Sequence, residues 1–289
     1  MSRVQDIIAD VIIKRLEKGT IPWKPTWRLQ APQNYISKKP YNGLNMLLLS
    51  MQEYKFPYYL TFKQIQALRA YVKHGEKGHI ITYYAKSNNN KDDEDGSDKQ
   101  DSKKIKTFLR YYTVFNIEQT TIELDDVITG TDMIKVPKID SCVSLINNIC
   151  DLPRITHTGF NPCYNKHSDE IILPQAKNFD SIEHYYSALF HELTHSTGHL
   201  KRLNRPSLTT TNRFGSNSYS EEELVAEIGA FMLCCECGIS NNTVDNQMAY
   251  ISGWLNALKN NKGMIFKASS QAKKAYEYLL NTSQLRVAV

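Results

Sequence analysis

The sequence predicts an α+β protein of two domains, and neither part shows the pattern of a doubly wound sheet. The N-terminal part combines short helices with two β-branched and aromatic runs, at residues 80–84 and 108–115. The C-terminal part carries several helices of apolar periodicity around two short strands. We place the domains at residues 1–128 and 129–289, with a connecting segment at residues 122–140.

Charge separates the same two parts. Lys and Arg outnumber Asp and Glu by 14 to 5 over residues 1–86, whereas residues 129–289 hold 15 of each kind. A local basic excess favours a polyanionic partner for the N-terminal part, although a solvated basic surface is the simpler alternative.

The composition, with 41% hydrophobic and 22% charged residues, is typical of a soluble globular protein. The chain begins with polar residues and contains no apolar run near 18 residues, so we expect no signal peptide, no membrane association and a cytoplasmic location. The six cysteines form no Cys-x-x-Cys pair, and we expect them to be reduced.

In the N-terminal part, apolar residues at helical spacing predict an amphipathic helix over residues 3–18, ended by Gly19, and a short buried helix over residues 41–49. Thr61 is the expected cap of a helix that runs to about Val72, with Phe62, Ile65 and Leu68 facing inward. The runs 80–84 and 108–115 should pair as antiparallel strands. Between them, residues 86–104 are almost entirely polar, and we expect a disordered loop at about residues 87–104.

Basic residues alternate with aromatic residues throughout this part, as single-stranded nucleic acid binding requires. Bases stack on aromatic faces while Lys and Arg contact phosphates. Most aromatic residues of a domain nevertheless belong to its core, and that alternative stays open. The candidate DNA-binding residues are Trp23, Lys24, Trp27, Arg28, Lys38, Lys39, Tyr41, Asn45, Lys63, Gln64, Lys73 and Lys77.

In the C-terminal part we expect a short helix over residues 141–150 and strands over residues 156–165 and 170–174. The second strand directly precedes the helix that carries His191, and as an edge strand it would suit peptide binding by β-addition. Two further helices are marked by apolar residues at 248–258 and 272–279.

The segment Phe190-His-Glu-Leu-Thr-His195 lies within a helix that Asp180 or Ser181 can cap and Gly198 can end. His191 and His195 are i and i+4, so both imidazoles leave one face and can hold one Zn²⁺ ion. Glu192 lies about 100° around the helix from His191, where a general base for a metal-bound water belongs. Two histidines that merely decorate a helix face are the alternative.

The third ligand is left open by the sequence. A metzincin has its third histidine at the position that Lys201 occupies here, so the metzincin subclass is excluded. His199 is a poorer candidate for the third ligand, because it lies beyond Gly198, where the helix is expected to end. Glu223 and Glu227 share one face of the next helix, and the pattern resembles the thermolysin-like gluzincins. We assign Glu223 as ligand and Glu227 as the partner of a ligand histidine, with Glu227 as the substitute ligand.

The residues around Glu223 also allow a different role for this side chain. Ser220-x-x-Glu223 also fits a capping box, which would occupy Glu223 at the start of its helix. Glu221 and Glu222 are expected to be first-turn carboxylates favoured by the helix dipole.

Tyr219 or His199 could stabilise an oxyanion during peptide hydrolysis.

The order of motifs along nearly the whole chain resembles the ArdC-like antirestriction proteins of plasmids and other mobile elements. The matching residues include Pro22-Trp23-x-x-x-Trp27, Tyr41-Asn-Gly-Leu-Asn45, Gly75-Glu-Lys-Gly78, Phe190 to His195, Glu222 to Glu227 and Ala272-Lys-Lys-Ala275. The resemblance implies an N-terminal single-stranded DNA-binding domain and a C-terminal zincin-like metallopeptidase domain with one Zn²⁺ on His191, His195 and a glutamate of the second motif. The acidic loop at residues 87–101 departs from the family, and we expect it to point away from DNA.

We therefore expect a mobile-element protein that binds single-stranded DNA and cleaves a protein substrate at a Glu192-dependent zinc site, with no nucleotide cofactor. One alternative is a DNA-shielding protein whose zinc is structural or vestigial. The other is an ordinary intracellular zinc peptidase whose N-terminal part recognises protein.

Overall fold

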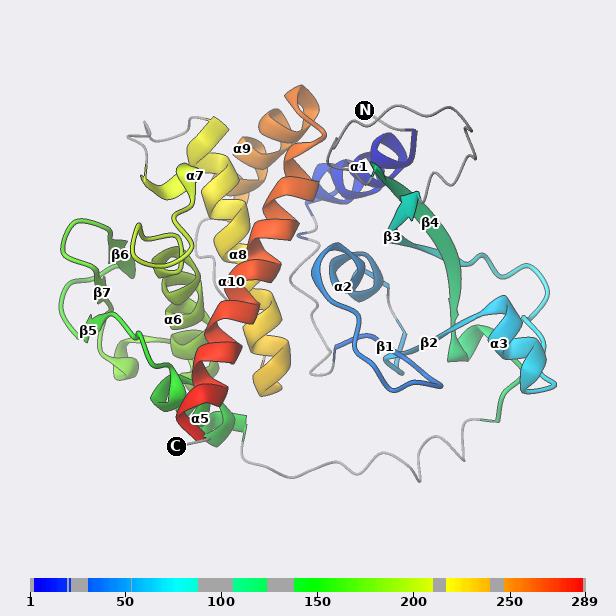
Figure 1. Ribbon diagram of the computed structural model, residues 1–289, viewed down its shortest axis with the longest axis horizontal. Helices are drawn as coiled ribbons and strands as arrows, with labels where there is room; N and C mark the ends of the chain where they lie inside the picture. The colour runs from blue at the N-terminus through cyan, green and yellow to red at the C-terminus, as the bar shows by residue number, and fades with distance from the viewer. Residues whose placement is uncertain are drawn as a thin grey trace, which may run out of the picture.

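The computed structural model describes residues 3–19, 21, 31–52, 54–87, 106–123, 138–209, 217–239 and 247–287. It is an α+β structure in which the N-terminal elements lie beside a larger, mainly helical C-terminal part (Figure 1). This confirms the predicted fold class. The polar loop between the two strands and most of the connecting segment lie outside the described residues.

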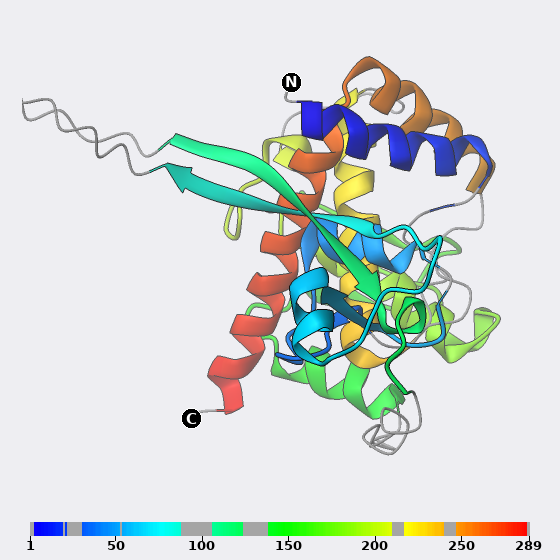
Figure 2. The ribbon, with the colours of Figure 1, turned by 90° about the vertical axis from the view of Figure 1, so that its right-hand side faces the viewer.

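The N-terminal sheet has four strands in the order β1-β2-β4-β3. β1 (Gln33–Asn34) is parallel to β2 (Tyr58–Thr61), while β4 (Lys106–Asn116) is antiparallel to both β2 and β3 (His79–Ser87). The predicted hairpin is confirmed, with Ile80 opposite Thr113 and Tyr83 opposite Arg110. Its far end extends away from the body of the molecule (Figure 2).

Three helices accompany this sheet, namely α1 (Arg3–Glu17), α2 (Gly43–Ser50) and α3 (Phe62–Ala67). The first two match the prediction, but α3 ends five residues before the expected Val72. Thr61 and Gln64 form the capping box at its start, yet Arg69 adopts a positive φ of 56° that stops the helix. Of the three expected inward residues only Ile65 is buried, and Phe62 and Leu68 are exposed.

The C-terminal sheet consists of β5 (Arg154–Thr156), β7 (Glu170–Ile172) and β6 (Cys163–Asn165), in that order. The single strand predicted over residues 156–165 is wrong, because Gly159 takes a φ of +77° and the chain turns there. The expected edge position of residues 170–174 is also wrong. β7 is the central strand, and β6 is an edge strand that lies beside the helix carrying His191.

The described residues of the C-terminal part form six helices. They are α5 (Lys138–Asn148), α6 (Ile182–Ser196), α7 (Pro206–Thr209), α8 (Asn217–Cys237), α9 (Gln247–Asn260) and α10 (Met264–Val287), and the single-turn 3₁₀ helices η1 (Ile117–Gln119) and η2 (Ala176–Asn178) occur in loops. α8 packs between α6 and α10 (Figure 1). Its face toward α6 carries the candidate ligand Glu223.

The two parts share one hydrophobic core. Ile8, Ile12 and Leu16 of α1 belong to the same buried cluster as Trp254 of α9 and Ile265 of α10. α2 contributes Leu47 to this cluster and contacts both α8 and α10. A second cluster, around Phe190, packs α6 against α5 and α8. The predicted boundary in the sequence therefore does not coincide with a boundary in the core.

All six cysteines are free thiols, as expected. Within the described ranges we find no helix long and apolar enough to cross a bilayer.

Candidate metal centre

Helix α6 carries the His-Glu-x-x-His segment, and its first residues explain why it begins where it does. The Ser181 hydroxyl accepts a hydrogen bond of 3.1 Å from the His184 N–H, which confirms Ser181 as the cap. Leu189 and Leu193 are buried in the core, whereas Ile182 is exposed. The core-facing residues fix the helix rotation and turn His191 and His195 toward α8.

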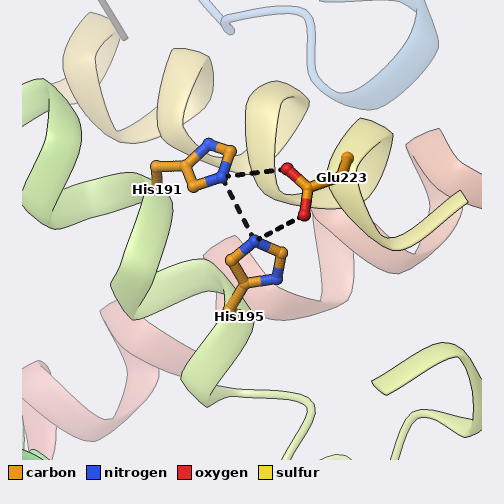
Figure 3. A group of neighbouring side chains, drawn as sticks. All are labelled: His191, His195 and Glu223. Atoms are coloured by element: carbon orange, nitrogen blue, oxygen red, sulfur yellow. Dashed lines mark hydrogen bonds and ion pairs between the residues drawn. The ribbon is translucent and has the colours of Figure 1, made fainter. Parts of the chain in front are cut away.

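Glu223 of α8 meets the two histidines (Figure 3). Its carboxylate oxygens lie 3.5 Å from Nε2 of His191 and 3.6 Å from Nε2 of His195. The two Nε2 atoms are 3.1 Å apart, and one donor atom from each of the three residues falls within 4.8 Å of the others. The structure thus brings together the three residues assigned from the sequence as ligands.

The start of α8 resolves the alternative reading of Glu223. The helix is already formed at Asn217, so Ser220 lies inside it and cannot be the N-cap of a capping box. The close approach of α8 to α6 depends on Gly229, because a Cβ atom at that position would lie 2.4 Å from Cγ2 of Thr194. Glu223 is consequently available to the histidines.

The three side chains fit a tetrahedral divalent ion. With metal–ligand distances of about 2.0–2.2 Å, neighbouring donor atoms of such an ion lie about 3.3–3.6 Å apart, close to the 3.1, 3.5 and 3.6 Å observed. Carboxylates beside the Nδ1 atoms favour a proton on each Nδ1, so the two Nε2 atoms that face one another are the nitrogens that can bind a metal ion.

Each candidate ligand histidine has its own supporting carboxylate. Oε1 of Glu227 lies 3.5 Å from Nδ1 of His191, as expected for a residue that orients a ligand. Oε1 of Glu222 lies 3.2 Å from Nδ1 of His195. Our interpretation of Glu221 and Glu222 as first-turn carboxylates is wrong, because the helix already begins at Asn217. The Glu222 side chain is buried against α6 instead.

Arg205 and Ser207 hold the Glu222 carboxylate in place by hydrogen bonds, and neither residue was predicted from the sequence. An Arg205 N–H donates to Oε1 of Glu222 at 2.6 Å, and the Ser207 hydroxyl donates to Oε2 at 2.6 Å. Arg205 is 1% exposed and also donates to the Thr194 carbonyl at 2.8 Å. One feature of the sequence could have indicated that Glu222 needs such partners, namely the nearly unbroken apolar run after Glu223. A helix without a polar face is buried in the protein, and a charged residue on a buried helix needs a partner.

The electrostatics of the centre follow from burial and from these pairs. Burial raises the pKa of Glu192, and the neighbouring His191 and His195 reduce this effect only in part. Burial alone would also raise the pKa of Glu222, but its bonds to His195 and Arg205 hold that pKa at about 2. For His191, three carboxylates outweigh burial and raise the pKa to about 9. The centre is thus strongly acidic and attracts cations.

A cavity of about 570 Å³ opens onto the candidate ligands and Glu192. Cys163, Tyr164 and Asn165 of β6 form one wall, and Tyr219 of α8 lies on another. His199, the other candidate for oxyanion stabilisation, does not line this cavity. Its Nδ1 accepts from the Lys201 N–H at 3.3 Å, within the turn after α6. The geometry favours Tyr219.

The candidate DNA-binding residues that the structure describes differ in their surroundings. Asn45 exchanges two hydrogen bonds of 2.7 Å with the backbone of Thr82, and Gln64 caps α3, so both amides have a structural role. Nζ of Lys38 lies over the rings of Tyr35 and Tyr58.

Nζ of Lys73 donates to the Glu118 carbonyl at 2.9 Å, and Tyr41 packs edge-on against Tyr59. The side chains of Lys39, Lys63 and Lys77 are exposed. Trp23, Lys24, Trp27 and Arg28 lie outside the described residues.

Two family models match the chain. The N-terminal domain of the anti-restriction factor ArdC matches residues 2–115, and a zincin-like metallopeptidase matches residues 148–271. Two crystal structures of the antirestriction protein ArdC from plasmid R388 are each 31% identical and cover 98% of this chain. The metal-free structure is covered to 99% with a TM-score of 0.76, and the Mn(II)-bound structure to 98% with a TM-score of 0.73.

Curated relatives give the same picture. Two DNA primases named TraC, from Escherichia coli, are 31% identical over 98% and 97% of this chain. The chain spans only 20% and 27% of their lengths. An uncharacterised protein, y4eC, of Sinorhizobium fredii is 28% identical over 96% of this chain and 91% of its own length.

Proposed function

Because the chain belongs to the family of ArdC antirestriction proteins, we propose that it binds single-stranded DNA through its N-terminal domain and hydrolyses a peptide bond in its zincin-like domain. The observation that carries the peptidase proposal is the buried carboxyl of Glu192 in a cavity where His191, His195 and Glu223 converge. A purely structural metal site has no use for that carboxyl.

His191, His195 and Glu223 would hold one Zn²⁺ ion per chain. When bound, this ion supplies Lewis acidity toward a carbonyl oxygen and lowers the pKa of a water molecule. Glu192 takes the proton of the attacking water and returns it to the leaving amine. The raised pKa of Glu192 suits both steps, because a group that must accept and then donate a proton works best near the ambient pH.

β6 and Tyr219 would position the substrate. β6 is an edge strand of the described sheet and forms a wall of the cavity, so an extended peptide can add to it by backbone hydrogen bonds. The phenol of Tyr219 can donate to the oxygen that becomes negative as the water attacks.

The β3–β4 hairpin supports the DNA-binding proposal. The rings of Tyr83 and Tyr112 stack at 4.3 Å with an interplanar angle of 3°, and Tyr112 is exposed. Arg110 lies opposite Tyr83 and on the same face as Tyr112. An aromatic surface beside a cation is what unpaired bases and their phosphates require. In the family's setting, such binding would protect a strand that enters a cell with a mobile element.

The test combines DNA binding with mutation of the proposed base. We expect a labelled single-stranded oligonucleotide to bind more tightly than the same sequence as a duplex, with an affinity that falls steeply as salt rises. The purified protein should contain one zinc ion per chain. Replacement Glu192→Gln should leave DNA binding and metal content unchanged while peptidase activity on a quenched-peptide library falls by about 10²–10⁴-fold.

Glu183→Gln, in the first turn of the same helix, is the matched control and should retain activity. Equal peptide hydrolysis by wild type and Glu192→Gln would leave a DNA-shielding protein with a metal site. Salt-insensitive action without any preference for single strands would leave an ordinary peptidase.

A further inference from the structure

A second cavity, of about 330 Å³, lies where the N-terminal and C-terminal parts meet. Gly43 and Leu44, at the start of α2, form one side. Phe266, Ser269, Ser270 and Lys273 of α10 form the other, at the i, i+3, i+4, i+7 spacing of a single helix face. This cavity is separate from the metal centre, and the proposed peptidase uses none of it.

The first residues of α2 line this cavity. The first turn of an α-helix leaves backbone N–H groups without intrahelical partners, and the Asn42 side chain makes no capping bond to them. Gly43 has a φ of +56°, a conformation that other residues adopt with strain. The stem of Lys273 packs over this glycine, since a Cβ atom there would be 3.7 Å from Cδ of Lys273.

Ser269 gives independent evidence for a ligand. Its side chain lines the cavity, is only 2% exposed and has an Oγ atom without a hydrogen-bond partner in the described part of the chain. A helical serine ordinarily satisfies its hydroxyl by donating to a carbonyl in the preceding turn. A buried hydroxyl without a partner is unfavourable, so an acceptor atom in the cavity would stabilise it.

The chemistry of the walls selects the ligand. Backbone N–H groups, two serine hydroxyls and an ammonium group can all donate, and none of the described residues that line the cavity carries a carboxylate. The Lys273 ammonium pairs with Glu277 at 3.0 Å, but both side-chain ends are partly exposed and such a pair exchanges readily. Leu44, Leu109 and Phe266 add an apolar wall. We infer that this cavity binds a phosphate group that is attached to a nucleoside.

Such a phosphate has two sources, a DNA strand bound to the N-terminal part or a free nucleotide. A free nucleotide could occupy the cavity whether or not the N-terminal part binds DNA, so the site can be tested with a mononucleotide alone. In either case α2 and α10 would close on one ligand, so binding would tie the two parts of the molecule together.

The test uses Ser269→Ala and Lys273→Gln, with Lys274→Gln as the matched control. Lys274 is an exposed neighbour on α10 that does not line the cavity. Ser269→Ala should fold normally, because it removes a hydroxyl that has no partner within the protein. Thermal unfolding is followed with inorganic phosphate and with a deoxynucleoside monophosphate, at constant ionic strength. A labelled single-stranded oligonucleotide is titrated in parallel.

If the phosphate comes from a free nucleotide, the monophosphate raises Tm of wild type and Lys274→Gln, and the rise is lost in the other two variants. If it belongs to a strand, the small ligands have no effect, and Ser269→Ala and Lys273→Gln each weaken oligonucleotide binding about tenfold relative to Lys274→Gln. Either result supports the site. Equal behaviour of all four proteins toward every ligand overturns it. A chain that binds the monophosphate but no oligonucleotide contradicts the proposed DNA binding alone.

Discussion

At the residue scale, Glu222 shows how a ligand histidine is fixed by its surroundings. The Glu222 carboxylate orients the His195 ring, and Arg205 and Ser207 in turn hold this carboxylate in place. All four side chains are buried. We predict that Glu222→Gln lowers zinc affinity about 10–100-fold, because the loss of such a partner leaves the imidazole less basic and less well oriented. Competition with a chromogenic chelator measures the affinity.

The adjacent Glu221 provides the control for that change. It pairs with Lys267 near the surface at 2.7 Å and does not contact either histidine. Glu221→Gln should therefore leave zinc affinity unchanged. Equal affinities for the two variants would show that Glu222 does not orient His195.

A second residue-scale prediction concerns Asp169, which anchors the turn after α6. It accepts hydrogen bonds of 2.8 and 3.0 Å from Arg202 and one of 2.7 Å from the Tyr164 hydroxyl. Partial burial raises its pKa, but these bonds lower it more, so the net shift is downward. A carboxyl with a lowered folded-state pKa stabilises the fold above its unfolded pKa of about 3.9. This contribution is lost as the pH falls through the folded-state value.

Asp169→Asn should therefore reduce the free energy of unfolding by roughly 1–3 kcal/mol near pH 7. The difference from wild type should shrink as the pH falls below about 4, where Asp169 becomes protonated in the unfolded chain, and should vanish once the pH is below the lower folded-state pKa. Urea denaturation at a series of pH values measures this. Asp180→Asn is the control, because Asp180 is almost fully exposed. A pH-independent difference would contradict the assigned role of the Asp169 charge.

At the scale of elements, the sequence predicted most of the helices and the hairpin but misplaced their ends. The hairpin and α1 follow from apolar periodicity, which burial imposes directly. α3 ends early because Arg69 adopts a left-handed conformation that its residue type does not signal. His191 and His195 could be chosen from helical spacing alone, whereas the choice of Glu223 over Glu227 also rested on the resemblance to gluzincins. The support from Arg205 could not be predicted, since it depends on how the chain returns after α6.

The contact between α6 and α8 yields an element-scale prediction. Gly229 faces Thr194 so closely that an added methyl group would lie 2.4 Å from Cγ2 and 2.7 Å from Oγ1. Gly229→Ala should push the helices apart, with a cost of about 1–3 kcal/mol that exceeds the gain in helix propensity. Zinc affinity should fall too, because Glu223 lies on the displaced helix. Thermal unfolding with and without zinc measures both effects.

Gly253 on α9 is the matched control, since a Cβ atom there meets no atom within 4 Å. Gly253→Ala should leave zinc affinity unchanged and stabilise the protein by about 0.5–1 kcal/mol through helix propensity. If Gly229→Ala behaved in the same way, α8 would not be held at this distance by the glycine.

At the scale of the whole molecule, the two domains are joined more closely than their sequence signatures indicate. Helix α1 buries Ile8, Ile12 and Leu16 in a cluster that also contains Trp254 and Ile265, which lie in the C-terminal part of the chain. α1 is also linked to the C-terminal helices by ion pairs of 2.6 Å, Glu17 with Lys259 and Asp10 with Lys262. Neither part can bury these faces alone.

We therefore predict that the full chain unfolds in a single cooperative transition, with a calorimetric enthalpy equal to the van't Hoff enthalpy. A fragment of residues 1–128 would expose the apolar faces of α1 and α2, and a fragment of residues 129–289 would expose the matching faces of α9 and α10. Each fragment alone should lack a cooperative transition and bind a hydrophobic dye. Mixing the two should restore part of the transition. A cooperative transition in the isolated N-terminal fragment would show that its own sheet is a sufficient core, and that the shared cluster only docks two independent domains.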